Sequence, residues 1–373
     1  SSEMIYPLLP VFLSTVLGAT AIQLGLIEGV AESTASILKV VSGVWTDRAG
    51  RRKPLIVFGY SVSGLFRPFI GLAQSWHWVL LLRFMDRVGK GLRTSPRDAL
   101  IADVTPLEIR GRAYGSHRAM DHAGAVIGPL IAGVLLLLPG MDLRRVFLAA
   151  VVPAIITLPV LALGIREGAK APVRTKSLAS SWRGDWRKLG RNFKLYLAAV
   201  LIFSLGNATD AFLIVRLSES GVTPSVLAVL WSLHHVTKML STYYGGRLAD
   251  VWGARTMILL GWLFYAAVYA AFAYVDSPAA LIGIFLAYGC YFGLVEPAER
   301  AWVAEQIPES LRGTAFGVFH FSVGLGALPA SLLFGWVWHQ WGAPSAFMMG
   351  AGLALVASVS LFQVRRSSAT RVR

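Results

Sequence analysis

Ionisable side chains interrupt the apolar segments of this chain, and the segment 76–99 carries the densest group of them. It contains Arg83, Asp86, Arg87 and Lys90, with further basic residues toward its end. At 3.6 residues per helical turn, Arg83, Arg87, Lys90 and Arg97 fall on one stripe. A charge at the centre of a membrane helix costs about 2.5–3.5 kcal/mol on insertion scales, so this stripe must face acids or water. Groups of this kind usually mark a substrate or proton path.

Other apolar segments supply acids and histidines that could face this stripe. Glu28, Glu32 and Lys39 lie within about 40° of one another on a helix. His117 and Asp121 are four residues apart and therefore share one helix face. The predicted substrate and proton path consists of Glu3, Glu28, Glu32, Arg83, Asp86, Arg87, His117, Asp121, Asp210, His235 and Glu296.

Two hypotheses follow from these charges. Loss of water favours the protonated form of a carboxyl group, and a nearby arginine favours the ionised form. An acid between the two influences can exchange protons as a cavity opens to either side; the candidates are Glu3, Glu28, Glu32 and Asp121. The basic excess on 76–99 suggests a second hypothesis, in which the substrate carries a negative group that Arg83 or Arg87 binds. A buried ion-pair network that only fixes helix register is the structural alternative.

The composition places these residues in a membrane protein. The chain has 373 residues, of which 55% are hydrophobic and only 15% charged, whereas a soluble domain carries about 25% charged residues. The net charge of +15 does not indicate a nucleic-acid partner, because the basic residues fall between apolar segments. The single Cys290 excludes an internal disulfide.

Apolar segments long enough to span about 30 Å recur along the whole chain. The sequence therefore predicts an all-α membrane protein with twelve transmembrane helices in two pseudo-symmetric six-helix bundles. The chain opens on Ser1 without a methionine, so the first helix is expected to lack its natural start. The predicted spans are 4–20, 22–45, 54–73, 76–99, 110–138, 144–164, 193–217, 224–248, 255–274, 278–304, 312–338 and 343–364.

Charged loops predict the topology. Basic residues concentrate in the turn 48–53, the stretch 165–194 and the tail 365–373, all on one side of a twelve-span arrangement. The positive-inside rule then places both termini in the cytoplasm, as in a bacterial inner membrane protein. The predicted domains are an N-terminal bundle (1–164), a basic linker (165–192) and a C-terminal bundle (193–373).

The two predicted bundles are related by an internal repeat. An offset of 202 aligns Pro106, Arg110 and Gly111 with Pro308, Arg312 and Gly313. An offset of 203 aligns Gly43, Asp47, Gly50 and Arg52 with Gly246, Asp250, Gly253 and Arg255. Two related halves joined by a linker are typical of transporters, with the binding site expected between the halves.

Four motifs along the chain resemble those of the major facilitator superfamily. "SGVWTDRAGRRKPL" (42–55) is similar to the family's first signature, and "RFMDRVGKG" (83–91) to its helix 4 motif. The glycines of 115–133 resemble the helix 5 motif of its antiporters, and "YPLLPVF" (6–12) its helix 1 pattern. The family has one arginine on helix 4, matched by Arg83, so the further charges there depart from its pattern.

The resemblance implies roles for several of these motif residues. The turn after the second predicted span is expected to form a cytoplasmic latch against helix ends, with a counterpart in the second half. Its residues are Asp47, Arg48, Arg51, Asp103, Asp250 and Arg255. Gly124, Gly128 and Pro129 are expected to let helices pack closely, and the motif they belong to implies antiport and export.

The histidines allow a metal hypothesis. His235 and Met239 form an HxxxM pair similar to one in copper-transporting members of the superfamily, and His117 is a further candidate. Imidazole and thioether groups suit copper, but no cysteine lies near them in sequence. We therefore predict no metal site and no cofactor, and keep these three residues as the candidate ligands.

The predicted function is secondary active transport of a small solute by alternating access, coupled to protons and directed outward. A copper-like or anionic-solute importer is the alternative, and a membrane-embedded enzyme or lipid flippase the alternative from another class. The chain lacks GxxxxGK[ST] and HExxH, which argues against ATP hydrolysis and metalloprotease chemistry; we predict no enzyme activity. The predicted partners are the lipid bilayer, a small-molecule or ion substrate and protons, with no nucleic acid and a monomeric state.

Overall fold

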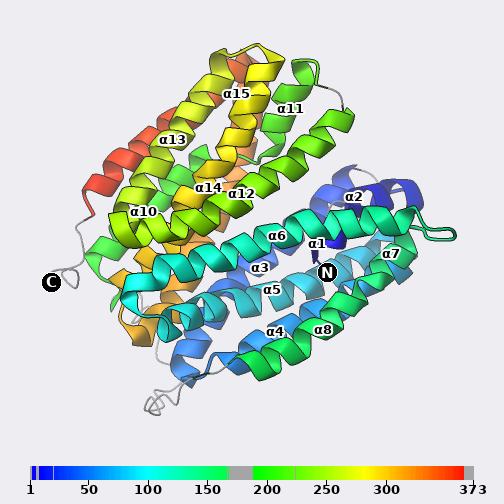
Figure 1. Cartoon of the computed structure of the whole chain (residues 1–373), viewed down its shortest axis with the longest axis horizontal. Helices are drawn as coiled ribbons and strands as arrows, with labels where there is room; N and C mark the ends of the chain where they lie inside the picture. The colour runs from blue at the N-terminus through cyan, green and yellow to red at the C-terminus, as the bar shows by residue number, and fades with distance from the viewer. Residues whose placement is uncertain are drawn as a thin grey trace. The chain divides into compact units, whose positions relative to one another are not determined.

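Lipid offers backbone N–H and C=O groups no hydrogen-bond partner, so an apolar chain of this kind must satisfy them within helices. A computed structural model describes residues 2–5, 8–19, 21–165, 167, 188–222 and 224–364, and all regular structure among them is helical (Figure 1). The first part of the chain forms α1 (Ser2–Ile5), α2 (Leu9–Val11), α3 (Ala21–Ala49), α4 (Lys53–Phe66), α5 (Trp76–Val104), α6 (Arg110–Leu136), α7 (Leu143–Ala149) and α8 (Val151–Gly164). The second part forms α10 (Arg191–Gly206), α11 (Ala211–Glu219), α12 (Pro224–Trp252), α13 (Ala254–Tyr274), α14 (Pro278–Gln306) and α15 (Arg312–Phe362).

Seven helical segments among the described residues are long and apolar enough to cross a membrane. The helices α3, α5 and α12 are absent from that set although each has 29 residues, which at 1.5 Å per residue is about 43 Å. They carry many of the charged residues considered above, so their sequence is less apolar. The number of twelve spans stays a prediction. The seven segments are Lys53–Leu72, Leu107–Leu136, Leu143–Gly164, Arg191–Glu219, Ala254–Tyr274, Pro278–Gln306 and Glu309–Phe362.

The first predicted span is not a continuous helix. The short helices α1 and α2 are followed by a π-helical turn at Phe12–Val16, and Gly18 has a positive φ of 64°. Pro10 lies at the start of α2, and proline cannot donate the backbone hydrogen bond that a continuous helix requires. Among its described residues, the predicted span 4–20 therefore consists of short helical pieces that end before Gly18.

Other predicted spans contain breaks at defined residues. Ala150 separates α7 from α8, where Pro153 has no N–H to donate to the preceding turn. Residues 207–210 separate α10 from α11. Gly342, with a φ of 82°, interrupts α15 between the two spans predicted there. Each break leaves backbone N–H and C=O groups without the hydrogen bonds that an unbroken helix would provide.

The described chain forms two compact units, each made of three segments that are separated in the sequence. Unit 1 contains Ser1–Leu100, Gly124–Gly184 and Ser310–Phe321, and unit 2 contains Ile101–Ala123, Asp185–Glu309 and Ser322–Arg373. Each unit therefore takes one short segment from the other half of the sequence. The division at 165–192 stays a proposal, and residues 168–187 of that predicted linker lie outside the described ones.

The core of unit 2 is aromatic and fixes the helix that carries Glu296. The helices α12 and α13 both pack against α14 (Figure 1). Tyr291 of α14 contacts rings of two other helices: its ring centroid lies 5.9 Å from that of Phe203 on α10 and 5.2 Å from that of Tyr265 on α13. These large buried rings hold α14 in a fixed rotation, so its polar side chains have fixed directions.

Close backbone approaches occur at equivalent places in the two units. In unit 1, a Cβ built on Gly43 of α3 would overlap the carbonyl oxygen of Gly313 at the start of α15. In unit 2, a Cβ built on Gly246 of α12 would overlap the carbonyl oxygen of Gly111 at the start of α6. The internal repeat relates these two pairs, so glycine is required by backbone contact at both.

We expect Gly313→Ala to destabilise the protein, because the added methyl would lie 2.5 Å from the Gly43 carbonyl oxygen and 2.8 Å from an Asp47 carboxylate oxygen. Overpacking of this kind costs about 1–3 kcal/mol. The measurement is the thermal midpoint (Tm) of the purified protein in detergent.

The matched control is Gly283→Ala in the interior of α14, where a Cβ meets no atom within 4 Å. Alanine is the better helix former, so this variant should unfold at an equal or higher temperature. Equal Tm changes at Gly313 and Gly283 would contradict the contact.

Candidate functional site

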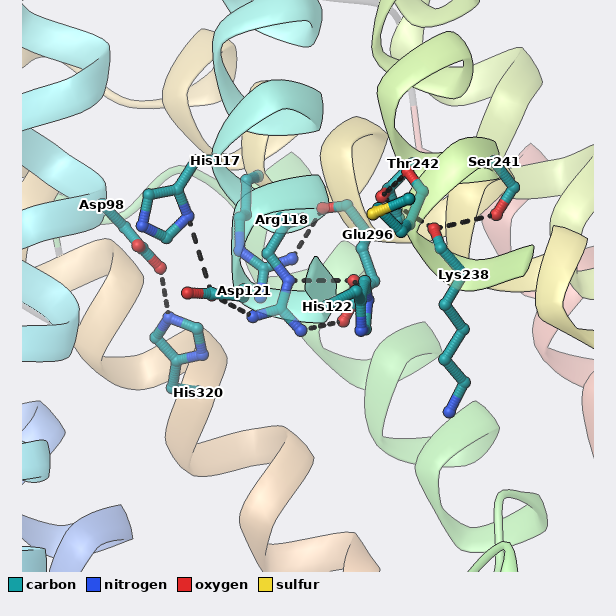
Figure 2. A network of polar contacts seen from close by, with 12 residues as sticks. Asp98, His117, Arg118, Asp121, His122, Lys238, Ser241, Thr242, Glu296 and His320 are labelled. Carbon is teal, nitrogen blue, oxygen red and sulfur yellow. Dashed lines mark hydrogen bonds and ion pairs between the residues drawn. The ribbon is translucent and has the colours of Figure 1, made fainter. Parts of the chain in front are cut away.

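Unit 2 contains a continuous network of ionisable side chains on α6 and α14. Arg118 Nε donates to Glu296 Oε2 at 2.8 Å, and a second guanidinium nitrogen bonds Glu296 Oε1 (Figure 2). His122 Nε2 lies 3.1 Å from Glu296 Oε2. A third nitrogen of Arg118 donates to Asp121 at 2.8 Å. One arginine therefore binds two carboxylates.

The network runs from a half-exposed acid to a buried one. The side chain of Asp121 is 43% exposed and that of Glu296 only 17% exposed. His117 Nδ1 lies 3.8 Å from Asp121 Oδ2, so a histidine stands at each end of the network. One guanidinium group therefore connects a half-exposed carboxylate to a largely buried one.

Sequence reasoning identified three residues of this network and missed two. His117, Asp121 and Glu296 were predicted, whereas Arg118 and His122 fall on the neighbouring helical stripe. The signal that could have found them is the i, i+3 and i, i+4 spacing of 118, 121 and 122 on one helix.

A further acid of unit 2, Asp210, lies at the break between α10 and α11. Asp210 stands at the N-cap position of α11, but its carboxylate caps no backbone group. It accepts hydrogen bonds from Lys238 Nζ at 3.1 Å and from the Tyr288 hydroxyl at 3.2 Å. The Lys238 ammonium also lies 3.7 Å from the centre of the Phe292 ring. Asp210 is thus held by two partners from neighbouring helices, and its place in the substrate and proton path stays a prediction.

The helix α5 carries the ion pairs of unit 1. Asp86 is 1% exposed, and its carboxylate oxygens form salt bridges with a guanidinium nitrogen of Arg67 at 2.5 Å and one of Arg83 at 3.4 Å. Arg83 also donates to Glu28 of α3 at 2.6 Å. The predicted residues Glu28, Arg83 and Asp86 therefore lie together, with Arg67 as a partner that the predicted path omitted.

Further charged residues of unit 1 lie on α3 and α5. Glu32 lies 3.8 Å from Lys39 on α3 and is half exposed, while Arg87 is 8% exposed. Near the end of α5, Asp98 accepts from Arg97 and lies 2.7 Å from His320 Nε2 (Figure 2). Asp98 and His320 were not among the predicted site residues. Glu3 was among the predicted site residues, but it lies outside the residues whose side chains the structure describes.

Each unit contains one aspartate that caps a helix from the other half of the sequence. In unit 1, Asp47 accepts backbone hydrogen bonds from Gly313 at 2.8 Å and Thr314 at 2.6 Å. In unit 2, Asp250 accepts them from Gly111 at 2.6 Å and Arg112 at 3.0 Å. A carboxylate at a helix N-terminus binds free N–H groups and complements the helix dipole.

These two caps lie beyond the predicted spans, and burial acts on both. Burial raises the pKa of the Asp47 and Asp250 carboxyl groups, although the backbone donors and the neighbouring arginines oppose that rise. Arg52 donates to Asp47 at 3.1 Å, whereas its repeat equivalent Arg255 donates to the carbonyl oxygens of residues 361 and 362. The two caps thus differ in their basic partner.

The remaining predicted latch residues differ in exposure. Arg51 is exposed, while Arg48 and Asp103 are partly buried at the ends of α3 and α5. The close helix packing expected at Gly124 is not seen among the described residues, because Gly124 is exposed and a Cβ there meets no atom within 4 Å. On the same helix, a Cβ at Gly115 would lie 2.5 Å from the Thr242 carbonyl oxygen. Gly128 is buried, and Pro129 lies inside α6.

Among the described residues, no group of three or more His, Cys, Asp or Glu side chains could hold a metal ion. His235 Nδ1 lies 3.0 Å from the Trp231 carbonyl oxygen, and its ring centroid is 6.1 Å from that of His122. His117 belongs to no such group with His235 in the described part of the chain.

Comparison with known proteins defines the class. The family model of the Major Facilitator Superfamily matches residues 1–230 and 195–373. The chain therefore belongs to the major facilitator superfamily, as the sequence motifs predicted, and is an integral multi-pass membrane protein of a transporter family.

Several relatives match most of the chain. An uncharacterised MFS-type transporter of Methanocaldococcus jannaschii is 31% identical over 370 residues, covering 97% of this chain and 90% of the relative. The multi-drug resistance efflux pump PmrA of Streptococcus pneumoniae is 25% identical over 338 residues, covering 87% and 82%.

Solved structures share the fold at low sequence identity. The fucose:proton symporter of Escherichia coli aligns with a TM-score of 0.78 and 14% identity over 98% of this chain and 95% of its own. The human organic anion transporter MFSD10 aligns with a TM-score of 0.76 and 17% identity, covering 94% and 88%.

We predict that Asp47→Ala and Asp250→Ala each destabilise the protein, because each leaves two backbone N–H groups without an acceptor. Losing such a partner costs about 1–3 kcal/mol per buried group. Asp47 should show the larger drop in Tm, since its side chain is 4% exposed and its pair with Arg52 is also lost.

The control for this comparison is Asp276→Ala. The Asp276 side chain is 91% exposed and pairs only at the surface with Arg216, so its loss should change stability by less than 1 kcal/mol. A larger effect at Asp276 than at Asp47 would disprove the capping role.

Proposed function

We propose that the chain is a proton-coupled secondary transporter that exports a small solute by alternating access. The observation that carries this proposal is the binding of Glu296 by both Arg118 and His122, with Asp121 as a second acid for the same arginine. Intramembrane acids and histidines arranged in this way are typical of proton relays.

The geometry supports a specific exchange. A proton that binds the Glu296 carboxylate competes with Arg118 for the same oxygens. Arg118 then keeps its bond to Asp121, which is half exposed. Loss of the proton restores the bidentate pair. If the two access states hold Arg118 differently, proton binding shifts the equilibrium between them, because only differential affinity can do so.

The direction and setting of transport are also proposals. The efflux pump PmrA among the relatives supports export, as does the antiporter-like glycine motif of α6. The caps at Asp47 and Asp250 are proposed to act as the cytoplasmic latch, with both termini in the cytoplasm of a bacterial cell. The protein is proposed to be a monomer. Copper transport has no support from the described histidines.

Transport into liposomes tests proton coupling, with ethidium and carboxyfluorescein as cationic and anionic probes. We expect an imposed pH gradient to speed the movement of a transported probe several-fold. Glu296→Gln should lose this acceleration but keep exchange of the probe down its own gradient, because a neutral side chain can no longer release a proton.

Glu108→Gln is the matched control, since Glu108 is an exposed acid in the turn before α6 and should behave as the wild type. Two results together would contradict proton coupling. In the wild type, the transport rate would be the same with and without the pH gradient, and neither Glu32→Gln nor Glu296→Gln would change that rate.

A further inference from the structure

Three basic side chains of unit 1 gather beside α3 and α5, and we call them the basic cluster: Arg87, Lys90 and Lys39. Arg87 and Lys90 are one turn apart on α5, and Lys39 lies on α3. All three lie within electrostatic reach of Glu32 on α3, and Lys90 lies within the field of both Arg87 and Lys39. Arg87 and Lys90 are also within reach of Asp86. The cluster therefore joins like charges in the interior of the unit.

The other acids nearby are already engaged. Asp86 is held by Arg67 at 2.5 Å, and Glu28 is held by Arg83 at 2.6 Å. Arg83 also reaches Asp86 at 3.4 Å, so it stands between two carboxylates. Of the two arginines that the sequence offered for anion binding, Arg83 is thus occupied by protein carboxylates.

Arg87 has no such partner. It is 8% exposed, and its Nε is buried without a hydrogen-bond acceptor among the described residues. The side chains of Arg87 and Lys90 form no hydrogen bond or ion pair with another described residue, although the Lys90 carbonyl oxygen accepts from Thr94 Oγ1 at 2.6 Å. Glu32 lies 3.8 Å from Lys39, and half of its side chain is exposed. Among the described residues of this region, the cations thus outnumber the acids: Arg67, Arg83, Arg87, Lys90 and Lys39 stand against Glu28, Glu32 and Asp86.

Such an arrangement is unfavourable without an additional anion. Like charges repel strongly where water is scarce, and a buried guanidinium without acceptors loses its hydration without compensation. An oxyanion supplies both charge and acceptors, and the planar fork of an arginine matches a carboxylate or phosphate group. The half-exposed Glu32 is placed as a counter-ion that an incoming anion can displace.

We propose that Arg87, Lys90 and Lys39 bind the anionic group of the transported solute, a carboxylate or phosphate group, and that Arg83 does not. The proposal rests on the proposed function only in that the chain carries a solute. It concerns unit 1, whereas the proposed proton site lies in unit 2, so each can fail alone.

Thermal unfolding of the purified full chain in detergent tests this binding. The probes are inorganic sulfate and phosphate, and benzoate compared with its neutral analogue benzamide, all at constant ionic strength. A ligand that binds the folded state raises its Tm. We expect the anions to raise the wild-type Tm by about 2–4 °C, with no rise from benzamide.

The variants Arg87→Gln and Lys90→Gln should lose this rise. Without added anion, Arg87→Gln should unfold at the wild-type temperature or above it, because it removes an unpartnered buried charge. Arg67→Gln should unfold at a lower temperature, since it leaves Asp86 without its closest cation. Arg247→Gln removes the same charge from an exposed position on α12 and should keep the full anion response.

Three results would overturn the proposal. The first is the absence of an anion-dependent rise in the wild type, and the second is an undiminished rise in Arg87→Gln and Lys90→Gln. The third is a rise in phosphatidylglycerol nanodiscs, relative to phosphatidylcholine, that depends on Arg87 while soluble anions have no effect; the cluster would then bind a lipid headgroup.

Glu296→Gln separates this proposal from proton coupling. We expect that variant to keep the anion-dependent rise in Tm while losing its response to a pH gradient. A normal gradient response in Glu296→Gln together with a lost anion response in Arg87→Gln would refute the proton site alone. The reverse pattern would refute the basic cluster alone.

Discussion

A charge within a bundle of apolar helices is stable only when a partner of opposite sign replaces its water, and this constraint organises both units. In unit 2, Arg118 joins Glu296 to Asp121, and Lys238 neutralises Asp210. In unit 1, Arg67 and Arg83 enclose Asp86. The pairs fix helix register. Each also contains a charged group for which a proton or an anion can compete with the partner side chain. Chemistry and stability therefore depend on the same contacts.

The internal repeat explains how two units reach the same local solution at their helix ends. Asp47 and Asp250 each cap a helix that starts in the other half of the sequence, beside a glycine–glycine contact. The glycine three residues after each aspartate has a positive φ, 65° at Gly50 and 84° at Gly253, a conformation that suits glycine alone. A motif that reads as a charged turn is therefore a device that holds a helix N-terminus.

Sequence reasoning gave the family, the helical class and many of the paired residues, because apolar length and charge spacing are local properties. It placed His117 with Asp121, and Asp47 in register with Asp250. It could not choose partners across helices, so Arg118 and His122 were missed and Arg83 was considered as free as Arg87. It also could not predict that a break at residues 207–210 presents Asp210, or that Gly124 faces open space, because both depend on how neighbouring helices pack.

The central claim is that paired charge holds the site together, and a double-mutant cycle on Arg118 and Glu296 tests it most directly. Stability is measured by chemical unfolding in micelles for Arg118→Gln, Glu296→Gln and the double variant. Breaking a buried pair from one side costs about 3–5 kcal/mol, so each single variant should be markedly less stable. The account predicts that the double variant recovers much of that loss, with a coupling of about 0.5–3 kcal/mol. Additive losses would contradict it.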